Sequence, residues 1–122
     1  MPQIFTVYQN DLSEISDLIN KEGWKCHVKA VAHTQANIHD DPRIGVMHFD
    51  SVYTKVAEVV ADDLNHVFEV GNIGPEDRIT RIAPMHSFSV GDIIEDADGN
   101  RWMIAKVGFT SLNQLFEQKD AA

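Results

Sequence analysis

The sequence MHSFSVGDIIEDADGNRWMIAKVGF, residues 85–109, predicts a turn, a strand, a tight turn and a second strand. Residues 90–92 are typical of a turn, because glycine adopts a positive φ at little steric cost and aspartate bonds nearby backbone amides. The Ile-Ile pair at 93–94 favours a strand. The Asp-Gly pair at 98–99 lies between apolar runs and is a strong hairpin signal, so residues 101–107 form the return strand.

The sequence leaves two registers open for this hairpin. A two-residue turn at positions 98–99 pairs Asp96 with Arg101, whereas a three-residue loop at positions 97–99 pairs Glu95 with Arg101. In both registers a carboxylate faces the guanidinium across the strands, a contact that contributes ~0.2–1 kcal/mol.

The acidic turn of the hairpin does not fit a calcium loop. An EF-hand loop has glycine at its sixth position and a bidentate glutamate at its twelfth. Counted from Asp96, Gly99 is fourth and Val107 is twelfth. A plain hairpin turn is therefore the favoured interpretation.

Length and composition predict one soluble domain spanning residues 1–122, with 43% hydrophobic residues to build one core. The single cysteine, Cys26, excludes an internal disulfide and suits a reducing compartment. The N-terminus lacks a basic and then apolar leader, and no run of residues is long enough to span a membrane. We therefore expect a cytoplasmic protein of a bacterial host.

The net charge of −9 and pI near 4.9 oppose direct binding to nucleic acid, because the ten basic residues are scattered. Acidity also suits mimicry of nucleic acid toward a protein that binds DNA or RNA. A solubilising surface charge is the simpler interpretation.

In the first half, a strand is expected at residues 4–9, apolar on both sides and so central in a sheet. A helix follows from Leu12 to Glu22, and Gly23 suits its C-terminal cap. Within residues 24–36, a stripe of Val28, Val31 and Ala32 favours a second helix, with a strand at 26–28 as the alternative. Residues 37–45 contain Asp-Asp-Pro and predict a mobile loop.

In the second half, a strand is expected at residues 53–60 and a short helix at 64–70 with Leu64, Val67 and Phe68 facing inward. A short strand at 79–82 precedes the hairpin, a helical turn at 112–118 follows it, and residues 117–122 are expected to fray. This order predicts an α+β fold. We expect a mostly antiparallel sheet, two or three helices packed on one side of it and a C-terminal β-hairpin.

Catalytic signatures are missing from the sequence, so we expect no catalytic residue, cofactor or metal. No histidine pair has the compact spacing of a zinc site. A metal-dependent hydrolase using His39, Asp40, Asp41 and His48 stays open as an alternative if that segment folds back on itself. Cys26 is expected to be an inert thiol, and Ser87 and Ser89 lack a nucleophile elbow.

Carboxylates concentrate in the middle of the chain. Paired carboxylates can do acid–base work only when burial or a neighbour shifts their pKa, and two acids at a helix start more often match the helix dipole. If these side chains form a partner-binding surface instead, the candidates are Asp62, Asp63, Glu69, Glu76 and Asp77.

Four segments resemble small accessory proteins of phages, plasmids and other mobile elements. They are YTKVAEV (53–59), DDLNHVF (62–68), HSFSVGDII (86–94) and GF (108–109). The closing part is similar to the YodL-like pattern of Ser-x-Ser-Val-Gly-Asp, a hairpin and then Gly-Phe. The resemblance covers only the second half of the chain, and it implies no enzymatic activity.

The resemblance implies a setting in which a small acidic protein binds a host component, for example one of a defence system. We therefore expect a non-enzymatic accessory protein that binds and modulates a host bacterial protein. The alternatives are an acidic nucleic-acid mimic, the metal-dependent hydrolase and a direct nucleic-acid-binding module with a small β-rich surface.

Overall fold

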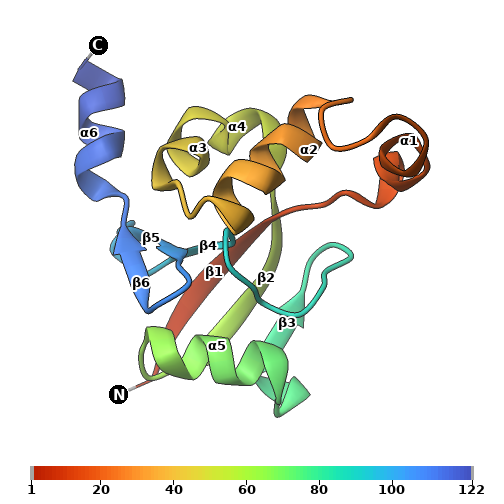
Figure 1. Ribbon diagram of the computed structural model, residues 1–122. Helices are drawn as coiled ribbons and strands as arrows, with labels where there is room; N and C mark the ends of the chain where they lie inside the picture. The colour runs from red at the N-terminus through yellow and green to blue at the C-terminus, as the bar shows by residue number, and fades with distance from the viewer. Residues whose placement is uncertain (1, 122) are drawn as a thin grey trace.

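The computed structural model describes residues 2–121, with side chains except those of 14 and 118–121. Strands and helices alternate irregularly along the chain (Figure 1). The strands are β1 (Gln3–Asn10), β2 (Tyr53–Ala61), β3 (Ile79–Arg81), β4 (Ile93–Glu95), β5 (Arg101–Ile104) and β6 (Phe109–Ser111). The α-helices are α1 (Ser16–Glu22), α2 (Val28–His33), α3 (Pro42–Met47), α4 (Phe49–Val52), α5 (Leu64–Asn72) and α6 (Asn113–Ala121). Shorter helical turns are η1 (Ser13–Ile15), η2 (Thr34–Ile38) and η3 (Glu76–Arg78).

The six strands form one antiparallel sheet in the order β3-β2-β1-β4-β5-β6. The α+β class is confirmed. The first strand lies inside the sheet, as its two-sided apolar pattern predicts. Among the described residues, no helix combines the length and apolarity needed to cross a membrane.

Helices cover both faces of the sheet, which corrects the expectation that they lie on one side (Figure 1). On one face, Val67 and Val70 of α5 pack with Phe5, Val7 and other buried residues of the sheet. On the opposite face, a second buried cluster joins Ala36 of η2, Val46 of α3 and Leu112 to Ile93 and Met103. The reason is local: the adjacent residues Ile93 and Ile94 of β4 point to opposite faces, and both are fully buried.

The hairpin has the three-residue loop, so the two-residue alternative is wrong. Glu95 lies opposite Arg101, and its Oε2 accepts a hydrogen bond from Arg101 Nε at 2.6 Å. Asp96 is instead used inside the loop, where its Oδ1 accepts from the N–H groups of Asp98 and Asn100. Gly99 has φ +86°, a conformation that suits glycine.

The first helices follow the prediction in outline. Helical residues run from Ser13 to Glu22, and Gly23, with φ +88°, donates its N–H to Ile19. The helix predicted after residue 24 is also present, as α2 followed by η2. Of its predicted stripe, only Ala32 is buried together with Ala30 and Ala36, whereas Val28 and Val31 are exposed.

The loop predicted at residues 37–45 is largely helical. Asn37 and Ile38 end η2, and α3 begins at Pro42 with Asp41 as its N-cap, so only residues 39–41 lie between helices. An Asp-Pro pair can start a helix as well as break one, because proline suits the first helical turn. The mobility of this segment stays a prediction.

The end of the chain forms a longer helix than the predicted turn, since α6 reaches Ala121. Fraying of residues 117–122 stays a prediction, and residue 122 lies outside the described residues.

Candidate binding surface

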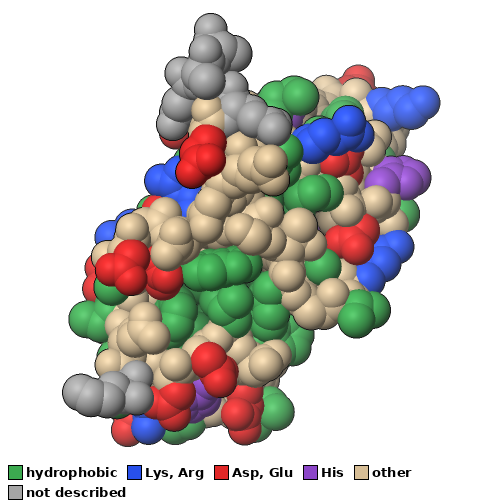
Figure 2. Space-filling view, turned by 90° about the vertical axis from the view of Figure 1, so that its left-hand side faces the viewer, with side chains coloured by type: hydrophobic (Ala, Val, Ile, Leu, Met, Phe, Trp, Pro, Cys, Tyr) green, Lys and Arg blue, Asp and Glu red, His purple; other side chains and the backbone are tan. Residues whose placement is uncertain are grey.

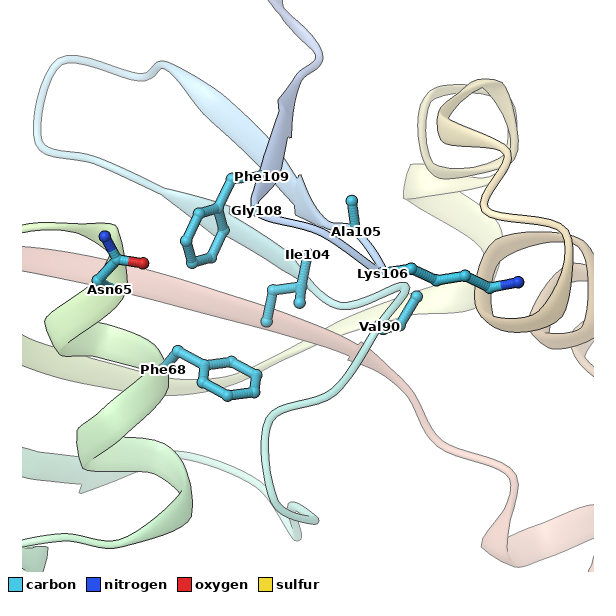
Figure 3. A pocket seen from close by; sticks show the side chains of 8 residues that line it. All are labelled: Asn65, Phe68, Val90, Ile104, Ala105, Lys106, Gly108 and Phe109. Atoms are coloured by element: carbon cyan, nitrogen blue, oxygen red, sulfur yellow. The ribbon is translucent and has the colours of Figure 1, made fainter.

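A hollow of about 280 Å³ opens between α5 and the end of the sheet that β5 and β6 form. Its lining is mainly apolar and consists of Asn65, Phe68, Val90, Ile104, Ala105, Lys106, Gly108 and Phe109. Figure 3 shows the side chains of Phe68, Ile104 and Phe109 converging on this space from different elements. Lys106 points away from it, and its Nζ donates to the carbonyl of Ile38 at 2.6 Å.

The packing of α5 explains why the hollow is open. Val67 and Val70 are buried against the sheet, and the helix contacts β2. Phe68 is one residue beyond Val67, about 100° further around the helix at 3.6 residues per turn. Its side chain therefore lies on the flank of α5 and is 39% exposed, so the prediction that Phe68 faces inward is wrong.

The sheet supplies the opposite wall. Ile104 of β5 lies directly opposite Phe109 of β6, so their side chains share one face of the sheet. Gly108, with φ +73°, closes the turn before β6, and its carbonyl accepts from the N–H of Ala105 at 3.0 Å. Phe109 packs at the margin of the buried cluster under α5, half-buried beside the space that α5 leaves uncovered.

Exposed apolar side chains continue beyond the hollow. Val107, in the turn before β6, is 92% exposed. Figure 2 looks onto the side of the molecule where β6 and α6 lie, and it shows hydrophobic side chains gathered in the middle with acidic side chains bordering them. Apolar surface rimmed by polar groups is typical of protein interaction sites.

The five predicted acidic residues are exposed, but they do not form one group. Asp62 and Asp63 precede α5, whereas Glu76 and Asp77 lie beyond its end in η3. The nine-residue helix between them is about 13 Å long at 1.5 Å per residue. Glu69 lies within that helix. Asp62 and Asp63 precede the end of α5 that carries Asn65, and Asn65 lines the hollow. This pair therefore lies nearest to the hollow.

The capping interpretation holds for Asp63 but not for Glu76. Asp63 is the N-cap of α5, where its Oδ1 accepts from the N–H of His66 at 2.8 Å. Glu76 forms an exposed ion pair with Arg81 at 2.6 Å. Exposed ion pairs of this kind add little stability, so the contact with Arg81 does not account for the presence of Glu76.

A buried polar network lies elsewhere in the fold, at the C-terminal end of β1. Asp92 is only 4% exposed, and its Oδ2 accepts from Gln9 Nε2 and from the N–H of Ser89, both at 3.0 Å. Gln9 also donates to the carbonyl of His86 at 2.9 Å and accepts from its N–H at 3.1 Å. The network therefore fastens the segment before β4 to β1.

Burial dominates the electrostatics of this network. Burial raises the pKa of Asp92 to about 7. The hydrogen bonds from Ser89 and Gln9 and the charge of His86 act in the opposite direction and lower this pKa. Burial and then the Asp92 charge raise the pKa of Tyr53, whose hydroxyl donates to the carbonyl of Gly91 at 2.6 Å.

A carboxyl group with a strongly raised pKa is a candidate catalytic acid when it faces a cleft. A cavity of about 400 Å³ lies nearby, lined by Asn10, Asp11, Leu12, Ser13, His33, His86 and Ser89. Asp92 is not part of that lining, and its bonded oxygen is turned to Gln9 and Ser89. We therefore assign Asp92 a structural role in holding the segment before β4.

Two residues of the alternative hydrolase site lie at the ends of α3. Asp41 caps α3 and binds Arg43 side chain to side chain at 3.0 Å, while His48 follows the last residue of α3. Asp40 has φ +53° between η2 and α3. Among the side chains that the structure describes, no three or more from histidine, cysteine, aspartate or glutamate are grouped so that they could hold a metal ion.

Comparisons with protein-family models, with curated proteins and with solved structures each found no match to this chain. The assignment of a function therefore depends on the geometry of the chain itself.

Sequence reasoning missed the hollow, although a signal for it was present. Val67 and Phe68 are adjacent in a helix, so they cannot both point directly at the sheet. It also missed the burial of Asp92, which was interpreted only as a turn residue. The signal was its position: Asp92 directly precedes Ile93 and Ile94, which are both buried, so its side chain lies at the edge of the core.

Proposed function

We propose that this chain is a non-enzymatic binding protein whose hollow between α5 and β5–β6 docks a protein partner. The observation that supports the proposal is an apolar hollow beside α5, at a place that α5 leaves uncovered, with Phe68 39% exposed on its wall. Burying such aromatic side chains in a partner supplies binding free energy, and aromatic residues are enriched at the centres of interfaces.

The partner that we propose is a cytoplasmic host bacterial protein, such as a component of a defence system. The similarity of the second half of the chain to YodL-like accessory proteins of mobile elements supports this setting. An accessory protein of that kind needs a binding surface and no reacting groups. The acidic side chains near the hollow, Asp62 and Asp63, favour a partner whose contact surface is basic around an apolar centre.

A matched pair of variants tests the proposal. Phe68→Asp introduces a carboxylate into the wall of the hollow, while Ile73→Asp adds the same charge at an 84% exposed position outside it. Each variant and the wild type are immobilised, exposed to a bacterial lysate and analysed by quantitative mass spectrometry. Circular dichroism confirms that both variants are folded.

The proposal predicts that the wild type and Ile73→Asp recover the same proteins from the lysate in equal amounts. Phe68→Asp is expected to recover at least tenfold less of these proteins, because burying a carboxylate in an apolar contact without a partner is costly. Equal recovery by the two variants contradicts the proposal, as does recovery of nothing above an empty matrix.

A further inference from the structure

The two edges of the sheet differ in how they are protected. The edge strand β3 lies between Pro75 and Pro84 and carries Arg81, which is paired with Glu76. Proline and charge are the usual means by which proteins prevent further strands from pairing at an edge. The opposite edge strand, β6, reads Phe-Thr-Ser and contains neither. Within residues 2–121 no strand lies beyond β6 (Figure 1).

The register of β5 and β6 shows which backbone groups face this open edge. The carbonyl of Gly108 accepts from Ala105, and the N–H of Leu112 donates to Arg101, so positions 108 and 112 point toward β5. In an antiparallel pair the direction alternates along the strand. Thr110 therefore also points toward β5, and the N–H and C=O groups of Phe109 and Ser111 point outward.

The outward groups lie beside the hollow. Phe109 lines the hollow and also offers one of the two outward N–H and C=O pairs. A strand added to β6 lies about 4.8 Å away, and the side chain opposite Phe109 projects to the same face of the sheet. That side chain lies within contact distance of the Phe109 ring, over the hollow.

The negative charge of this chain limits which kind of partner segment can bind at the β6 edge. A second copy of this chain would bring together two molecules that each carry −9. Exposed carboxylates of Asp62 and Asp63 lie at the end of α5 that borders the hollow. Both observations favour a segment that carries lysine or arginine.

We propose that the open edge of β6 accepts an extended, basic segment of a partner protein as a seventh strand, with one apolar side chain inserted in the hollow beside Phe109. This inference rests on the proposed function and specifies the form of the partner. Backbone hydrogen bonds to Phe109 and Ser111 supply a sequence-independent contact, and the hollow selects the apolar side chain.

The probe is a displayed library of random twelve-residue peptides, selected on the wild-type protein, from which the most enriched peptide is synthesised. Fluorescence anisotropy then measures its affinity for wild type, Ser111→Pro and Ser111→Ala. Proline at 111 removes one outward N–H but no hydrogen bond to β5, and prolines are tolerated at such edge positions. Alanine at 111 retains that N–H and controls for the lost hydroxyl.

The inference predicts at least a tenfold loss of affinity with Ser111→Pro and a change below about twofold with Ser111→Ala, since the backbone bond is retained. Two further peptides carry N-methyl groups on alternate amides, in the two possible phases. Only the phase that faces β6 loses binding, because N-methylation removes the donor and obstructs the edge. These peptides keep the test decisive even if Ser111→Pro does not fold.

The outcomes separate this inference from the proposed function. If the peptide loses affinity for Phe68→Asp but not for Ile73→Asp, while both N-methylated peptides bind as the parent does, the hollow binds a partner but β6 does not, and the inference is overturned. If the peptide binds Phe68→Asp and Ile73→Asp equally, no side chain of the peptide occupies the hollow and the inference is overturned, while the lysate comparison still decides the proposed function. A library from which no peptide is enriched on the wild-type protein also overturns the inference.

Discussion

The buried carboxyl of Asp92 makes stability depend on pH in a direction that is unusual for an aspartate. Its pKa is 3.8 in an ordinary environment and about 7 in the fold, because burial penalises the charged form. Between these pH values the folded protein holds a proton that the unfolded chain has released. The stabilisation is therefore fully present below pH 3.8 and is lost as the pH rises through about 7.

The magnitude follows from the same two values. Each pH unit between them costs about 1.4 kcal/mol, so the full loss is about 4 kcal/mol. Between about pH 5 and about pH 8 the free energy of unfolding is expected to fall by about 2.5 kcal/mol through this group.

Asp92→Asn tests this reasoning, because asparagine is neutral at every pH and its side-chain oxygen can still accept from Gln9 and Ser89. We expect the variant to be more stable than the wild type by about 1.6 kcal/mol near pH 5, because part of the loss has already occurred there. Near pH 8 the variant is expected to be more stable by about 4 kcal/mol, so the advantage grows by about 2.5 kcal/mol between the two pH values. Urea unfolding at the two pH values, followed by the fluorescence of Trp24 and Trp102, measures the difference.

Asp98→Asn is the matched control, since it removes one carboxylate from an exposed turn position. It is expected to retain the wild-type dependence on pH. The reasoning is refuted if Asp92→Asn shows the same difference between the two pH values as the wild type and Asp98→Asn do.

Three further substitutions test local contacts that hold the fold together, each by urea unfolding. Gly71→Ala is expected to destabilise by about 1–3 kcal/mol, because the added methyl group overlaps the ring of Phe88; Glu69→Ala, exposed on the same helix, should change little. Asp63→Ala is expected to cost about 1 kcal/mol by removing the N-cap of α5, whereas an equal loss from Asp62→Ala would contradict the capping role. Arg101→Lys is expected to cost about 1 kcal/mol, because the guanidinium lies 4.4 Å and 4.5 Å from the ring centroids of Phe49 and Phe116; an unchanged midpoint would show that this stacking contributes nothing.

Local chemistry made parts of the fold predictable. The Asp-Gly turn and its apolar flanks located the hairpin, and the two-sided apolar content of the first strand placed it inside the sheet. The register of the hairpin was not predictable, because both Asp96 and Glu95 are carboxylates within reach of Arg101. The loop chemistry decides it: Asp96 bonds three groups of the turn, the N–H of Asp98 and both the N–H and the side-chain amide of Asn100.

Helix orientation was predicted less well. Valines on α2 suggested a buried stripe, but close packing of α2 and η2 instead requires the small side chains of Ala30, Ala32 and Ala36. Gly91 shows how tight this packing is, since a β-carbon there would lie 3.1 Å from the methyl group of Ala36. Such contacts join segments far apart in the sequence, and no local pattern reports them.

The candidate site was the least predictable part. A hollow depends on which area of the sheet a helix leaves uncovered, and that depends on the position of α5 over β2 rather than on the residues of the hollow. Phe68 and Phe109 are therefore indistinguishable from core residues by sequence alone. The distribution of the five acidic residues, before, within and beyond α5, also required the fold.

Photocrosslinking from the wall of the hollow tests the central claim most directly. Phe68→p-benzoylphenylalanine places a photoreactive ring at the hollow, and Ile73→p-benzoylphenylalanine places the same group at an exposed position outside it. After irradiation in bacterial cells, the account predicts a discrete adduct of higher mass from position 68 and none from position 73. Adducts from position 73 alone, or from neither position, would contradict it.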